Sequence, residues 1–267
     1  MSSPPLTPRR QRHGVKGGEE KRKREMREMR EKIKNTKKEI REKRGVQLAL
    51  PSPSSPRLTE RDYTALAWLV EQKAATTSQV TILLGYLGDG PITDRRGSMI
   101  MARWEDLGLV ERTHVWHRKP AVVTPTFEAA RLMGLTRWRK PALGTLNHTL
   151  HASQVRLQVC RPGSSRGWRT EEQIRALLPA GARVPDGAIV ERDGSLTAVE
   201  VELTSHGRTR VREAMTSLLA VRAGDSDLFH HVLYLCAPAV VTQVTAVRDE
   251  LPAVAQARVV VLPCPSL

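Results

Sequence analysis

The stretch PDGAIVERDGSLTAVEVELT, residues 185–204, decides the fold expected for the second half of the chain. At its centre, Asp193-Gly194 is a strong hairpin-turn signal. Strand-like apolar runs at 188–190 and 196–203 flank the turn. The stretch therefore predicts two paired strands.

Three carboxylates fall on this predicted hairpin. Successive side chains of a strand point to opposite faces, so Glu200 and Glu202 share one face while Val199 and Val201 share the other. Asp186 begins the neighbouring strand. Grouped carboxylate oxygens suit Mg²⁺, which takes one or two carboxylates and keeps waters for chemistry on phosphate. The alternative is a solvent-facing strand whose acids pair with nearby arginines.

Helical and strand-like patterns alternate around the hairpin. Together they predict the order α, β, β, α, β, α, β and a mixed sheet. The helices are expected at 146–159, 209–223 and 240–251, and the further strands at 232–236 and 258–262.

An aspartate after proline, followed by acidic residues on the next strand, resembles the PD-(D/E)xK nuclease superfamily. The resemblance implies a restriction-endonuclease-like α/β domain over residues 142–267. In it Asp186 and Glu200 would bind Mg²⁺ and, with Glu202 at the usual lysine position, form the catalytic set. Glutamate at that position occurs in active members and in domains that have lost catalysis, so both outcomes stay open.

The same resemblance implies further contacts. Glu171 or Glu172 would supply the additional helix carboxylate that some members carry. His148 and His151 lie one turn apart with no third ligand evident, so we interpret them as packing or hydrogen-bonding residues. Residues after the second strand would approach phosphate: Thr204, His206, Arg208 and Arg210.

Residues 58–141 predict three helices followed by a hairpin. Cap residues mark the helix starts at Thr59, at Thr76 or Thr77, and at Thr93 or Asp94. Gly108 ends the third helix, and strands are expected at 109–113 and 121–124. This order is typical of a winged helix-turn-helix domain.

In that family the third helix enters the major groove of DNA. The candidate contacts on this helix are Arg95, Arg96, Ser98 and Arg103, and those at the wing tip are His117, Arg118 and Lys119. The alternative is a winged helix that contacts protein, with these side chains only solvated.

The charge of the chain favours a polyanionic partner. The sequence holds 43 Lys and Arg against 28 Asp and Glu, a formal net charge of +15. Residues 1–56 carry 17 basic and 7 acidic side chains, whereas residues 142–267 carry 13 and 12. Double-stranded DNA is the expected partner, and the excess charge lies upstream.

The N-terminal segments differ in composition from the rest. Residues 1–18 predict a disordered tail, 19–46 a charged basic helix and 47–57 a Pro/Ser-rich linker. Three interpretations of the helix stay open: a solvated helix, a dimerising coiled coil that would make the protein a homodimer, and a contact with phosphates.

Cysteine usage and hydropathy point to a cytoplasmic protein. Its expected DNA partner would associate it with the nucleoid or a plasmid. Cys160, Cys236 and Cys264 have no zinc-ligand spacing, which is typical of reduced, packed thiols. No apolar stretch approaches the ~20 residues of a membrane span.

Over residues 57–267 the chain is similar to the actinobacterial replication-relaxation family of plasmids, integrative elements and phages. The resemblance implies a DNA-binding role in replication, mobilisation or relaxation of an element. Two hypotheses follow: a Mg²⁺-dependent nuclease or nicking enzyme, and a non-catalytic sequence-specific regulator or replication factor on a degenerate nuclease fold. The segments that carry the resemblance are 104–108, 148–150, 168–171, 185–187 and 198–204.

Overall fold

The computed structural model describes residues 57–162, 164–223, 226–265 and 267. The tail and the basic helix, and the linker up to residue 56, lie outside the described residues. The described residues form one compact unit. Within it the protein is a mixed α and β structure with mixed sheets, as the sequence predicts.

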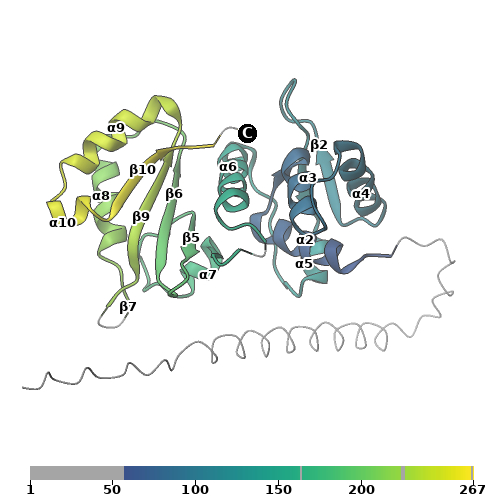
Figure 1. Cartoon of the computed structure of the whole chain (residues 1–267), viewed down its shortest axis with the longest axis horizontal. Helices are drawn as coiled ribbons and strands as arrows, with labels where there is room; N and C mark the ends of the chain where they lie inside the picture. Colours follow the sequence, from purple (N-terminus) through teal and green to yellow (C-terminus); the bar gives the residue numbers. More distant parts are fainter. Residues whose placement is uncertain (1–56, 163, 224–225, 266) are drawn as a thin grey trace, which may run out of the picture. The chain divides into compact units, whose positions relative to one another are not determined.

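The first part of this unit carries the expected helices and hairpin (Figure 1). A two-residue strand and a short closing helix were not predicted, since segments of this length carry no periodicity. The elements are α2 (Glu60–Gln72), β1 (Ala75–Thr76), α3 (Thr77–Tyr86), α4 (Asp94–Asp106), β2 (Val110–Thr113), β3 (Val122–Pro125) and α5 (Phe127–Leu132). The strands form an antiparallel sheet in the order β1-β3-β2.

Side-chain caps place the helix starts where the sequence indicates them. The Thr59 hydroxyl accepts from the Asp62 N–H, and the Asp62 carboxylate accepts from the Thr59 N–H, which is a complete capping box. Thr76 and Gln79 repeat the arrangement at α3, and Thr93 caps α4. The cap predictions are therefore confirmed.

The second part contains a five-stranded sheet in the order β10-β9-β6-β5-β4. Strand β5 pairs antiparallel with both of its neighbours, β4 and β6, while β9 runs parallel to both β6 and β10. The elements are α6 (Leu143–Val159), β4 (Gly167–Thr170), α7 (Glu171–Arg175), β5 (Gly187–Val190), β6 (Leu196–Glu202), α8 (Arg208–Leu219), β7 (Arg222–Ala223), β8 (Ser226–Asp227), β9 (Phe229–Cys236), α9 (Pro238–Asp249), α10 (Ala253–Gln256) and β10 (Val259–Pro263).

The hairpin between β5 and β6 forms at the predicted dipeptide. Gly194 has φ +90°, a conformation that a side chain would strain, and its N–H donates to the Glu191 carbonyl. The register pairs Gly187 with Val199, so Asp186 lies one residue beyond the last pair, beside Glu200.

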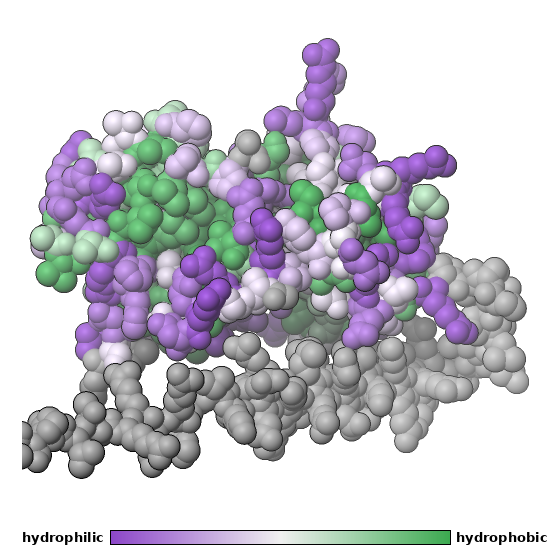
Figure 2. All heavy atoms as spheres, viewed as in Figure 1, coloured by the Kyte–Doolittle hydropathy of each residue, from purple (hydrophilic) through white to green (hydrophobic). Residues whose placement is uncertain are grey.

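Helices cover the two faces of the large sheet differently. Helices α8 and α9 pack on the face that carries Val232 and Tyr234, whereas α6 packs on the face that carries Val199 and Val201. Figure 2 shows apolar side chains gathered over the part of this second face formed by β9 and β10, where Leu262 is 46% exposed.

Helix α6 packs against both parts of the compact unit. Toward the helical part, the Ser153 hydroxyl donates to the Ala74 carbonyl, and Arg156 pairs with Glu71 at 2.6 Å. Toward the sheet, Val155 lies in the apolar core with β5, β6 and β9. The expected boundary at 141/142 thus falls just before a helix that both parts share. In the described part of the chain, none of the helices is long and apolar enough to cross a membrane.

Candidate functional site

Helix α4 exposes a basic face. Arg95, Arg96 and Ser98 are exposed near its N-terminus, while Gly97 is buried against α3. A Cβ at Gly97 would lie 2.2 Å from Thr81 Oγ1, so glycine allows α3 and α4 to approach closely here. The close approach holds α4 in place while its outer side remains free.

Arg103 lies farther along α4 and has a different environment. Its Nη2 donates to Asp62 Oδ2 at 2.6 Å, and the Asp62 side chain is completely buried. The same carboxylate accepts from Trp104 Nε1 at 3.1 Å. This places the guanidinium in a link between α4 and α2, apart from the exposed Arg95 and Arg96.

The turn between β2 and β3 carries the predicted wing residues. His117, Arg118 and Lys119 are all exposed, and Arg118 has φ +57° at the tip. Within the described residues, neither Arg118 nor Lys119 makes an ion pair. The turn is therefore a second exposed basic element in the helical part.

Asp186 is held by both the sheet and α6. Its Oδ2 accepts from the Val201 N–H at 2.8 Å and lies 3.0 Å from His148 Nε2. The same histidine nitrogen lies 3.1 Å from the Val201 carbonyl, so it is the protonated nitrogen that donates to both oxygens. The hydrogen bond to Asp186 raises the pKa of His148 above its usual value.

Glu200 is the buried acid of the group. Its two carboxylate oxygens accept from Nε and Nη2 of Arg183, each at 3.1 Å. Burial, and next the negative charge of Asp186, raise the pKa of Glu200 to about 7. The guanidinium only partly offsets these effects.

Glu202 lies farther along the same strand face and is half-buried. Its Oε1 is 3.3 Å from His206 Nε2. Burial raises the pKa of Glu202, while His206 and a hydrogen bond from the Thr204 backbone lower it. Each of the three predicted catalytic acids thus has a partner in the protein.

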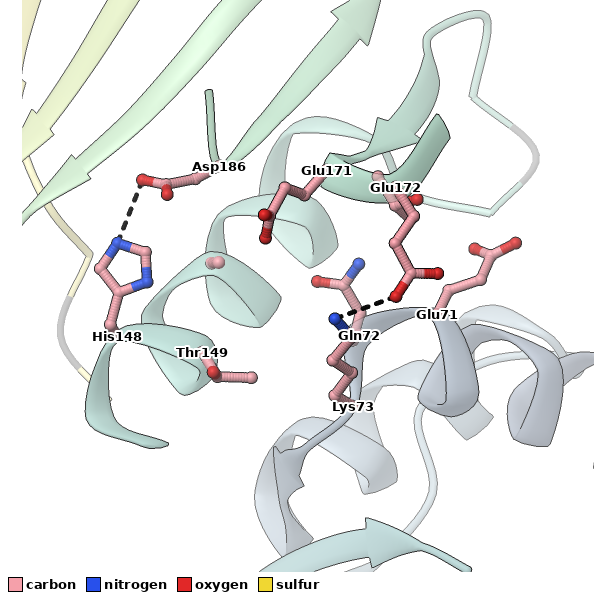
Figure 3. Close-up of a pocket in the computed structure, with 10 residues that line it drawn as sticks. Glu71, Gln72, Lys73, His148, Thr149, Glu171, Glu172 and Asp186 are labelled. Carbon is pink, nitrogen blue, oxygen red and sulfur yellow. Dashed lines mark hydrogen bonds and ion pairs between the residues drawn. The ribbon is translucent and has the colours of Figure 1, made fainter. Parts of the chain in front are cut away.

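The acids of α7 line the same cavity as Asp186 without joining the other carboxylates. A cavity of about 80 Å³ lies between the end of α2, α6 and α7. Figure 3 shows His148 pointing at Asp186 on one side, and Glu172 pointing at Lys73 on the other. Glu172 pairs with Lys73 at 3.1 Å, and Glu171 pairs with Arg175 at 2.6 Å.

The predicted phosphate contacts separate into two groups. Arg208 points to Glu250, with which it forms an ion pair, and Thr204 is exposed in the preceding loop. His206 and Arg210 instead line a second cavity beside Glu202.

In this arrangement protein partners engage the carboxylates proposed to bind Mg²⁺. Both oxygens of Glu200 accept from Arg183, and Asp186 Oδ2 already takes two hydrogen bonds. Among the described residues, no group of three or more His, Cys, Asp and Glu side chains could hold a metal ion. Direct binding of Mg²⁺ by Glu200 would require the Arg183 pair to open.

Sequence reasoning missed two members of this site. Arg183 was not singled out, although it lies three residues before Asp186. His148 was interpreted as a packing or hydrogen-bonding residue, with no assignment to the acids. Its position 38 residues before Asp186 gives no local signal of their contact.

Comparisons of the chain with protein-family models, curated proteins and solved structures give no match.

Proposed function

We propose that the protein binds double-stranded DNA through a winged helix formed by residues 58–141. The observation that carries the proposal is the two-sided character of α4. One side buries Ile100, Met101 and Trp104, while the other exposes Arg95 and Arg96. A helix held by its apolar side with exposed arginines on the other has the form of a groove-reading helix.

The hairpin supports the same proposal. Strands β2 and β3 follow α4 directly, and the turn exposes Arg118 and Lys119. Together with Arg95, Arg96 and Ser98 these would form the DNA-contacting set. We assign Arg103 to positioning, because Asp62 already holds its guanidinium.

We further propose that the second part is a nuclease-like domain, and that the chain acts in replication, mobilisation or relaxation of a plasmid, integrative element or phage. The order α6, β4, β5, β6, α8, β9, with Asp186 and Glu200 at adjoining strand positions, supports the nuclease-like fold. The three acids are already paired, Glu200 with Arg183, Asp186 with His148 and Glu202 with His206. We therefore favour the non-catalytic alternative over Mg²⁺-dependent cleavage.

DNA binding is tested by fluorescence anisotropy with labelled duplex across a salt series. Each phosphate contact contributes a slope of roughly −0.9 in log affinity against log salt. The Arg95→Ala/Arg96→Ala variant is therefore expected to weaken binding and to reduce the slope by about 2. Arg131→Ala, which removes an exposed arginine of α5 paired with Glu128, is the matched control. Equal binding by the double variant and the wild type would refute the proposal.

Cleavage is tested separately with supercoiled plasmid in Mg²⁺, Mn²⁺ or EDTA. The favoured function predicts intact plasmid together with a salt-sensitive gel shift. Metal-dependent nicking that the Asp186→Ala/Glu200→Ala variant lacks would establish the nuclease instead.

A further inference from the structure

A second cavity lies on the α8 side of the sheet, next to Glu202. Its volume is about 40 Å³, and Arg183, Glu202, His206, Arg210 and Tyr234 line it. A single water needs ~10–15 Å³ of such space. The cavity therefore has room for more than one water-sized group.

Tyr234 lines this cavity, and its buried hydroxyl has no hydrogen-bond partner among the described residues. Tyr234 is 1% exposed, and its OH is one of the buried polar atoms left unsatisfied in the described part of the chain. Leaving a buried hydroxyl unpaired costs ~1–3 kcal/mol. A group that supplied an acceptor oxygen would remove this cost.

The start of α8 adds further donors beside the same cavity. Its N-cap is Gly207, which provides no side-chain cap, so the first backbone N–H groups lack helical acceptors. Arg210 lies in this first turn and, within the described residues, has no ion pair. Arg208 differs, because it pairs with Glu250.

The two carboxylates next to this cavity already have partners in the protein. Glu202 is paired with His206 and receives the Thr204 N–H, and Glu200 beside Tyr234 is paired with Arg183. The hydrogen-bonding groups that remain unmet can all donate: a phenol, a guanidinium and helix N–H groups. Such a set is complementary to an oxyanion.

The loop before α8 is fixed in place. The Ser205 hydroxyl donates to Gln243 Oε1 at 2.6 Å, and Gln243 Nε2 donates to the His206 carbonyl. Gln243 belongs to α9, so the second helix of this face holds the loop that leads into the cavity.

We propose that this cavity is a binding site for an oxyanion of the phosphate class, held by the Tyr234 hydroxyl, the Arg210 guanidinium and the N-terminus of α8. The site requires no metal and does not depend on DNA binding by α4. Its phosphate would come either from the solution or from the end of a nucleic acid strand.

The test is isothermal titration calorimetry of inorganic phosphate into the full chain at constant ionic strength. Saturable binding is expected, weakened about tenfold or more by Tyr234→Phe and by Arg210→Gln, since each removes a hydrogen bond to a charged group. Arg131→Gln, an exposed arginine remote in sequence, should bind phosphate as the wild type does. Absence of saturable binding, or full binding by both cavity variants, would overturn the proposal.

Thermal unfolding separates a ligand role from a structural one. Without phosphate, Tyr234→Phe should unfold at the same or a higher temperature than the wild type, because it removes an unsatisfied hydroxyl. With phosphate, only the wild type and Arg131→Gln should gain stability.

Two duplexes identify the source of the phosphate. If it is a strand end, a duplex with a 5′-phosphate binds more tightly than the same duplex with a 5′-hydroxyl, and Tyr234→Phe abolishes the difference. If it is free phosphate, the two duplexes bind equally while calorimetry still shows the site. DNA binding through α4 survives either result, so the two proposals fail independently.

Discussion

Replacing Asp62 with alanine should destabilise the protein by about 3–5 kcal/mol. The variant leaves Trp104 Nε1 buried without an acceptor, at ~1–3 kcal/mol, and deprives the Arg103 guanidinium of its buried partner. It also removes half of the capping box at α2, worth ~1 kcal/mol.

Glu128→Ala is the matched control for this prediction. Glu128 forms a pair with Arg131 of the same length, 2.6 Å, but its side chain is 57% exposed where that of Asp62 is fully buried. Exposed pairs contribute ~0–1 kcal/mol, so the control should be nearly neutral.

The assay is urea unfolding followed by circular dichroism, with thermal unfolding alongside. For a compact unit of this size the loss corresponds to a decrease of roughly 10 °C in melting temperature. A loss below 1 kcal/mol in Asp62→Ala would show that the buried carboxylate does not anchor α4. DNA binding measured well below the transition should remain, because Arg95 and Arg96 are still present.

Three further predictions concern the second part. Gly187→Ala should cost about 1–3 kcal/mol in urea unfolding, because its Cβ would lie 2.0 Å from Trp168 Cζ2. Gly144→Ala, with open space around the Cβ, should be neutral or stabilising. Equal effects of the two substitutions would contradict the close packing of Gly187 against Trp168. The pKa of Glu200 is raised from 4.5 to about 7, so its contribution to stability, about 3 kcal/mol, is present below pH 4.5 and lost as pH rises through 7. The free energy of unfolding of Glu200→Gln should therefore rise relative to that of the wild type between pH 5 and 8. Parallel stability profiles of the two proteins would exclude this. The Arg156 guanidinium pairs with Glu71 at 2.6 Å and lies over the Trp68 ring, 5.4 Å from its centroid. Lysine cannot keep both contacts, so Arg156→Lys should cost about 1 kcal/mol in thermal unfolding. An unchanged melting temperature would argue against that role.

Much of the secondary structure could be predicted because its signals are local. Thr59, Thr76 and Thr93 begin helices by accepting hydrogen bonds from residues three positions on. Asp193-Gly194 forms its turn within four residues. Short elements such as β1 and β7 escaped prediction, because two residues form a strand only when a partner strand is present.

The sequence by itself determined where the long helices and the central hairpin lie, and that Glu200 and Glu202 share a strand face. The tertiary structure decided what those acids do. Arg183, 17 residues from Glu200, and His148, 38 residues from Asp186, reach the carboxylates only when the sheet and α6 pack together. It also assigned Arg103 to Asp62, 41 residues away, rather than to the exposed face of α4. The physical reason is that a buried charge needs a partner, and packing decides which side chain comes close enough to pair with it. The spacing of two residues along the chain does not predict that distance in space.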